Sequence, residues 1–166
     1  MKTALKRLVD QTYSKTQAGN LVREYLQARI LETLQITGGM IPLAFQGGTA
    51  LRFLYDLPRF SEDLDFALER PDDGFDFQKI LEKIKRGFEK ENYTVQLKVS
   101  TRKVVHSAFV RFPGLLFELG LTGHRNQVLS IKLEVDTNPP AGASLETTVV
   151  RRHVLLQLQH HDQASL

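Results

Sequence analysis

Two carboxylates, Asp63 and Asp65, are separated by a single apolar residue, Leu64. On an extended strand, side chains two positions apart emerge on the same face, with Cα atoms about 6.5 to 7 Å apart. Because like charges repel, two carboxylates on a strand that packs into a core need a positive partner or an exposed cleft to stay ionised. A divalent cation bound by both meets that need, and two such ions can clamp the attacking and leaving oxygens of a phosphoryl transfer.

A third carboxylate is available on the alternating segment Leu129–Asp136, where Glu134 and Asp136 share one face. We favour Glu134 as the third ligand because apolar residues bury its strand on both sides, whereas Asp136 lies where the strand exits into a loop. Both acids remain candidates for activating an attacking hydroxyl. Lys132 lies on the same face, so it is expected either to contact a triphosphate or to relieve the repulsion among the carboxylates.

A glycine turn lies upstream of the first acidic pair. Gly47, Gly48 and Thr49 open a predicted helix, with Thr49 as its N-cap. Free backbone N–H groups and the helix dipole favour a phosphate at such a position. The turn alone is weak support for phosphate binding, and its combination with the downstream aspartates is what discriminates.

The elements that must position these residues follow from hydrophobic periodicity. Helices are predicted from Asn20, as N-cap, to Ile36, from Thr49 to just before Pro58, and over Phe75–Glu91, which carries the basic residues Lys79, Lys83, Lys85, Arg86 and Lys90. Strands are predicted at Ile41–Phe45, Ser61–Leu68, Tyr93–Val99, Val104–Phe112, Leu115–Leu121 and Val128–Asp136. Loops are expected at Pro71–Asp76 and around Asn138, Pro139, Pro140 and Gly142, then a strand or short helix at Thr147–Leu158 and a solvated polar end, His160–Leu166. This pattern predicts an α/β (α+β) fold with a mixed sheet flanked by helices.

Composition sets further limits on function. The 166 residues are 42% hydrophobic and 25% charged, which suits a single globular domain over residues 1–166, and the net charge of +3 permits a polyanionic partner without demanding one. Since the chain has no cysteine, any metal must be held by carboxylates or histidines, which favours a hard cation such as magnesium. No segment is long and apolar enough to span a membrane or resembles a signal peptide, so we expect no membrane association and a cytoplasmic location.

The joint pattern is specific enough to suggest a family. The segments Phe45–Leu51 and Arg59–Phe66 resemble the signature of the AbiEii/AbiGii toxin family, a branch of the DNA polymerase beta-like nucleotidyltransferase superfamily. The superfamily pattern is a Gly-Gly or Gly-Ser pair at a helix start, a spacer, and then an Asp-x-Asp or Asp-x-Glu strand. Thirteen residues lie between Thr49 and Asp63, which fits that spacer.

The resemblance implies transfer of a nucleoside monophosphate from an NTP to an acceptor such as tRNA, with Mg²⁺ or Mn²⁺ as cofactor and a cognate antitoxin as a possible partner. By position it makes Asp63 and Asp65 metal ligands, and the segment Ile131–Val135 is compatible with the family strand that carries the third carboxylate. The residues expected to contact the NTP are Gly47, Gly48, Thr49, Arg59, Ser61 and Lys132.

One departure keeps a second interpretation open. The family pattern continues into a lysine-bearing helix, a later Arg-Asp segment and a Tyr-Asp pair, and nothing after Val150 matches these. We therefore expect residues 1–166 to be the N-terminal part of a longer family architecture. The alternative function is a non-catalytic module that binds NTP or RNA, or that docks an antitoxin. An unrelated hydrolase is disfavoured, since it would leave the glycine turn unexplained.

Overall fold

The computed structural model describes residues 2–69, 75–138 and 144–162. Its helices are α1 (Thr3–Asp10), α2 (Lys15–Ile36), α3 (Gly47–Tyr55), α4 (Phe77–Glu89) and α5 (Leu115–Glu118). Its strands are β1 (Leu43–Gln46), β2 (Leu64–Leu68), β3 (Gln96–Ser100), β4 (Val105–Pro113), β5 (Val128–Asp136), β6 (Leu145–Arg152) and β7 (Val154–His161). Most of the loops predicted at Pro71–Asp76 and Asn138–Gly142, and the end of the chain after Asp162, lie outside the described residues.

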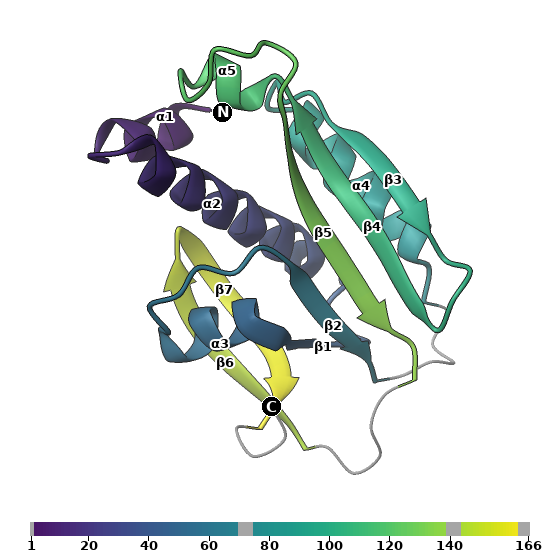
Figure 1. The fold of residues 1–166 in the computed structure, drawn as a ribbon. Coiled ribbons are helices and arrows are strands. Elements are labelled where there is room, and N and C mark those ends of the chain that lie inside the picture. The colour runs from purple at the N-terminus through teal and green to yellow at the C-terminus, as the bar shows by residue number, and fades with distance from the viewer. Residues whose placement is uncertain (1, 70–74, 139–143, 163–166) are drawn as a thin grey trace.

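These strands form one mixed sheet in the order β3-β4-β5-β2-β1-β7-β6. The β2–β5 and β1–β7 pairs are parallel, and the other pairs are antiparallel. Figure 1 shows α2 and α4 behind the sheet and the strands β4 and β5 in front of them. The predicted fold class, a mixed sheet flanked by helices, is confirmed.

The core lies between the sheet and the helices. Leu64 and Phe66 of β2 are buried on the face opposite the acidic pair, as the alternation predicts. Phe45 of β1 packs its ring against Phe66 at 5.4 Å and against Phe53 of α3 at 6.2 Å. The apolar side of each central strand is therefore occupied by helices, and its polar side is turned the other way. Within the described residues, no helix combines the length and apolar character that crossing a membrane requires.

Two predicted helix starts are wrong. Helix α2 begins at Lys15 rather than after Asn20, because the Ser14 side chain accepts a hydrogen bond from the Gln17 N–H and caps the helix there. Helix α3 begins at Gly47, with Gln46 rather than Thr49 at the N-cap position. The helix over 75–91 is confirmed and is capped by Asp76.

Toward the C-terminal end, two predictions are wrong, and the strand alternative for the segment 147–158 is confirmed. The segment Leu115–Leu121 is not a strand, since it contains α5, and an apolar run of this length does not distinguish the two. The segment 147–158 lies in an antiparallel hairpin of β6 and β7 that turns at His153, where φ is 64°. His160 and His161 are not a solvated tail but are both 1% exposed, because β7 is inserted beside β1 with Phe45 opposite His160.

Candidate functional site

The glycine turn lies directly against the second aspartate. Gly47 has φ +80°, a conformation that favours glycine, and a Cβ atom there would lie 2.5 Å from the Asp65 Oδ2 atom. A Cβ atom on Gly48 would lie 3.1 Å from the Ser61 hydroxyl oxygen. Both glycines therefore allow the start of α3 to approach the segment that carries the acids, as a phosphate-binding turn requires.

The sheet register brings the second and third carboxylates together. Because β1 and β5 flank β2 on its two sides, Asp65 lies opposite Gln46 on one side and opposite Glu134 on the other. Asp136 lies one pleat further along, opposite Ala67, and accepts a hydrogen bond from the Asn138 N–H. Glu134 is thus the better placed of the two candidates for the third carboxylate.

The three acids influence one another electrostatically. Burial, followed by repulsion from Glu134 and Asp63, raises the pKa of Asp65 to about 6. Lys132 partly offsets this effect and forms an ion pair with Glu134 at 2.6 Å, which in turn raises the pKa of the lysine. Lys132 therefore relieves repulsion among the carboxylates, one of the two roles expected for it.

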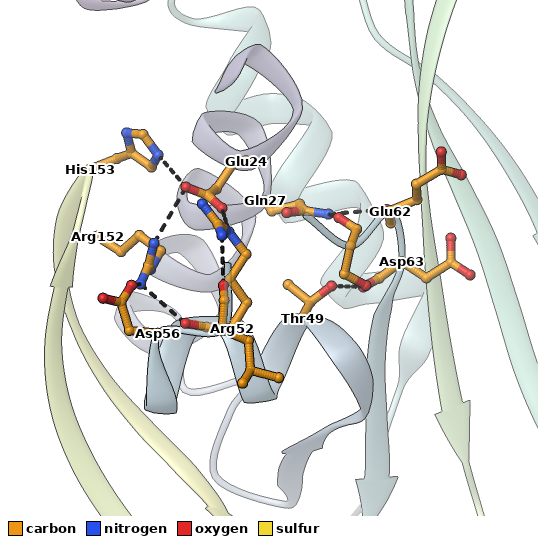
Figure 2. A network of polar contacts seen from close by, with 11 residues as sticks. Glu24, Gln27, Thr49, Arg52, Asp56, Glu62, Asp63, Arg152 and His153 are labelled. Atoms are coloured by element: carbon orange, nitrogen blue, oxygen red, sulfur yellow. Dashed lines mark hydrogen bonds and ion pairs between the residues drawn. The ribbon is translucent and has the colours of Figure 1, made fainter. Parts of the chain in front are cut away.

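Asp63 lies just before β2 rather than within it, so the predicted strand is shorter than Ser61–Leu68. Two side chains hold this approach to the strand (Figure 2). The Thr49 hydroxyl donates a hydrogen bond to the Asp63 carbonyl, and Gln27 of α2 donates to the carbonyls of Ser61 and Glu62 at 2.9 and 3.0 Å. Thr49 thus positions the segment that bears the acids instead of capping α3.

A second polar network anchors α3 and was not predicted. Glu24 of α2 is 3% exposed and forms ion pairs with Arg52 of α3 and with Arg152, and it accepts a hydrogen bond from His153 at 3.1 Å (Figure 2). Burial raises the pKa of Glu24, but the hydrogen bonds and charges of these partners outweigh burial and lower it. Arg152 also bonds Asp56 at 2.7 Å. The available signal was a charged residue on the same helical row as Ala28 and Leu31, which are both buried.

Asp65, Glu134 and Asp136 open onto a cavity of about 420 Å³. Its lining comprises Gln46, Gly47, Leu51, Asp65, Phe66, Val105, Glu134, Asp136 and His161. His161 was predicted to be solvated, yet its imidazole is buried and is hydrogen-bonded to Glu69, which follows β2. A second cavity, of about 570 Å³, is lined in part by Gly48, Arg59 and Ser61, so these three predicted residues also lie together.

The acidic cluster suits a hard cation, because carboxylate oxygens are the ligands that such ions prefer. The carboxylates also repel one another, as the raised pKa of Asp65 indicates. In the described part of the chain, however, no group of three His, Asp or Glu side chains is already arranged to enclose an ion. The residues that would hold such a cation are Asp63, Asp65 and Glu134. Lys132 would then leave its ion pair with Glu134.

A glycine turn beside sheet-borne carboxylates, on a mixed sheet backed by helices, agrees with the nucleotidyltransferase pattern that the sequence resembles. Residues 29–159 match the model of one family of this class, the nucleotidyl transferase AbiEii toxins of type IV toxin–antitoxin systems. The chain belongs to that family, as the resemblance of its motifs indicates. No curated protein matches this chain.

Two solved structures from Helicobacter pylori share the fold. A candidate nucleotidyltransferase is 23% identical, with a TM-score of 0.52 over 81% of this chain and 52% of its own. JHP933 is 22% identical, with a TM-score of 0.54 over 88% of this chain and 53% of its own. The chain thus spans about half the length of the structures it matches, and at this identity the likeness concerns the fold alone.

Proposed function

We propose that this protein is a metal-dependent nucleotidyltransferase that transfers a nucleoside monophosphate from an NTP to a hydroxyl acceptor, with an RNA such as tRNA as the acceptor. The observation that carries the proposal is the position of Asp65, which lies between the Gly47 turn and Glu134. This closeness supports a site in which the backbone N–H groups of the turn bind a phosphate and the neighbouring acids bind a cation. Membership of the AbiEii family supports the same activity.

In the proposed reaction, the acceptor hydroxyl attacks the α-phosphorus of the NTP and the bond to the bridging oxygen breaks, releasing pyrophosphate. The N–H groups at the start of α3, near Gly47 and Gly48, hold phosphate oxygens, and Arg59 and Ser61 bind alongside them. Asp63, Asp65 and Glu134 would hold Mg²⁺ or Mn²⁺, which would stabilise the negative charge on the reacting oxygens. Glu134 or Asp136 accepts the proton of the attacking hydroxyl.

The proposal also covers the role of Lys132, the cellular location, the partner protein and the domain organisation. The Lys132 ammonium, now paired with Glu134, would contact the triphosphate, which is the other role expected for it. We place the reaction in the cytoplasm, where NTPs and RNA acceptors are found, and a cognate antitoxin is the expected regulator. That residues 1–166 form one domain of a longer architecture stays a prediction, which the greater length of the matched structures supports.

The test is label transfer from each α-³²P-labelled NTP to total tRNA in the presence of Mg²⁺. Wild type is expected to label RNA, and Asp65→Asn, which removes the charge but keeps the size, is expected to lose at least 100-fold in rate. The control is Glu82→Gln, an exposed acid on α4 that lines neither of the two cavities at the site. Transfer that survives in Asp65→Asn would overturn the assignment of the site.

A second candidate is a binding module without catalysis, and the Lys132–Glu134 ion pair favours it because it neutralises part of the cluster from within the chain. The two candidates differ in outcome. If wild type binds NTP or RNA but transfers no label with any nucleotide, the binding module is the function.

A further inference from the structure

The face of the sheet that carries the acids continues onto β3 and β4. Their outward-facing positions include Lys98, Phe109 and Arg111, with Lys132 on the adjoining strand β5. We call these four residues the platform. In Figure 1 the helices α2 and α4 lie behind these strands, on the other side of the sheet.

The sheet register places the platform beside the carboxylates. Phe109 lies between Lys98 on β3 and Lys132 on β5, as the two antiparallel pairings show. The next row along the same face contains Ser107, paired with Glu134, which is paired in turn with Asp65. Rows two residues apart are about 7 Å apart, so the aromatic ring lies one row from the acidic cluster.

The charges on this face are of one sign until the acids are reached. The outward positions of β3 are Gln96, Lys98 and Ser100, and those of β4 include Ser107, Phe109 and Arg111, with no carboxylate among them. No ion pair joins Lys98 or Arg111 to another residue in the described ranges. The β3–β4 turn adds Arg102 and Lys103, which are both exposed.

Phe109 is only partly buried, although its neighbours Ala108 and Val110 point into the core and are almost fully buried. Its ring lies 5.8 Å from the Lys132 ammonium. An aromatic ring on an open sheet, flanked by cations, matches the two needs of a single-stranded nucleic acid, which are a surface for base stacking and positive charge along the backbone. A protein partner fits less well, because lysine is depleted and apolar area is enriched at the centre of protein interfaces.

We infer that the platform binds a single-stranded nucleic acid by stacking a base on Phe109 and pairing phosphates with Lys98 and Arg111. The terminal hydroxyl of the nucleic acid then reaches Asp65 and Glu134. The inference rests on the proposed function for the hydroxyl's role, but binding itself does not require catalysis. It assigns the acceptor to one face of the sheet and leaves the turn at Gly47 to the NTP.

Binding is measured by the fluorescence anisotropy of a labelled single-stranded RNA of ten nucleotides, without NTP or divalent cation. Phe109→Leu, which removes the aromatic ring but keeps an apolar side chain, is expected to raise Kd at least fivefold. Lys98→Gln and Arg111→Gln are expected to raise Kd and each to lower the slope of log K against log salt by about 0.7, whereas Phe109→Leu leaves that slope unchanged. A DNA strand of the same sequence shows whether the sugar hydroxyl contributes.

The matched control is Lys83→Gln, which removes the same charge from the basic cluster on α4, away from the acids. Circular dichroism melting verifies that each variant is folded. The inference is overturned if wild type does not bind, if the platform variants bind like wild type, or if Lys83→Gln causes the larger loss.

The same variants separate this inference from the proposed function. If the RNA binds through the platform but no form of the protein transfers label, the transferase function is contradicted and the RNA-binding inference is supported. If transfer depends on Asp65 but is unchanged in Phe109→Leu and Lys98→Gln, the RNA-binding inference is contradicted and the transferase function is supported.

Discussion

The carboxylates of Glu24 and Asp65 are both withdrawn from solvent, but their neighbours carry opposite charges. Glu24 faces Arg52, Arg152 and His153, which together outweigh burial and lower the pKa of Glu24. Asp65 faces Glu134 and Asp63, which add to burial and raise the pKa of Asp65 to about 6. The first carboxylate is satisfied by the chain itself, whereas the second is left with a need for positive charge that a ligand can meet.

The two regions also have different roles, one structural and one in the candidate site. The Glu24 network joins α2, α3 and the β6–β7 hairpin, and it includes no residue that lines the cavity beside Asp65. Its role is to hold α3, and therefore the Gly47 turn, in place. The repulsion in the Asp65 cluster lowers the stability of the folded state, as is common at functional sites.

The largest expected effect comes from breaking the satisfied network. Glu24→Gln leaves Arg52 and Arg152 without their buried partner and is expected to lower the free energy of unfolding by about 3 kcal/mol or more, since losing one member of a buried ion pair is costly. Urea denaturation monitored by circular dichroism measures the change. Glu118→Gln, which removes an exposed ion pair with Lys2, is the control and is expected to cost less than about 1 kcal/mol. Equal losses in both variants would contradict a special role for Glu24.

The opposite sign is expected at Asp65. The folded protein holds the Asp65 proton more tightly than the unfolded chain does, so this residue's contribution to stability is present below about pH 4 and is lost as the pH rises through about 6. Asp65→Asn should therefore stabilise the metal-free protein by about 2 kcal/mol at pH 7 and by almost nothing at pH 4. Urea denaturation at both pH values, in EDTA, measures this. The exposed Glu62→Gln should change stability little at either pH, and a destabilised Asp65→Asn at pH 7 would refute the contrast.

A divalent cation should remove much of the cost at the acidic cluster. At a free Mg²⁺ concentration ten times Kd, binding is expected to stabilise wild type by about 1.4 kcal/mol. The measurement is the melting temperature in a Mg²⁺ titration, with NaCl of equal ionic strength to correct for screening. Asp65→Asn should lose the response and Glu118→Gln should retain it. A response that persists without Asp65 would place the cation elsewhere.

The local acid pair could be predicted from sequence because it depends on short-range spacing. Asp63 and Asp65 lie two residues apart beside an apolar partner, and the glycine turn precedes a helix, so pattern and motif were sufficient. The alternation of 128–136 likewise placed the strand β5 at its observed bounds and Glu134 with Lys132 on one face.

What could not be predicted depends on pairings between distant segments. The parallel register that sets Glu134 opposite Asp65, and the insertion of β7 beside β1, are decided by the whole sheet. For that reason the polar sequence around His160 predicts a solvated tail, although His160 is buried in β7. The role of Glu24 could not be predicted either, because its partner Arg152 is 128 positions away along the chain.

The smallest expected effect tests how the two regions are joined at Thr49. Thr49→Val keeps the shape of the side chain but removes the hydroxyl that donates to the Asp63 carbonyl, so stability should fall by only about 1 kcal/mol. The acid at position 63 should nevertheless lose its fixed position, and the Mg²⁺ midpoint in the melting titration should rise severalfold. Thr33→Val is the matched control, since its hydroxyl bonds the Arg29 carbonyl within α2 and has no contact with the site. If both valine variants shift the midpoint equally, the hydroxyl of Thr49 acts on stability alone and the positioning of Asp63 depends on other contacts, with Gln27 the next side chain to change.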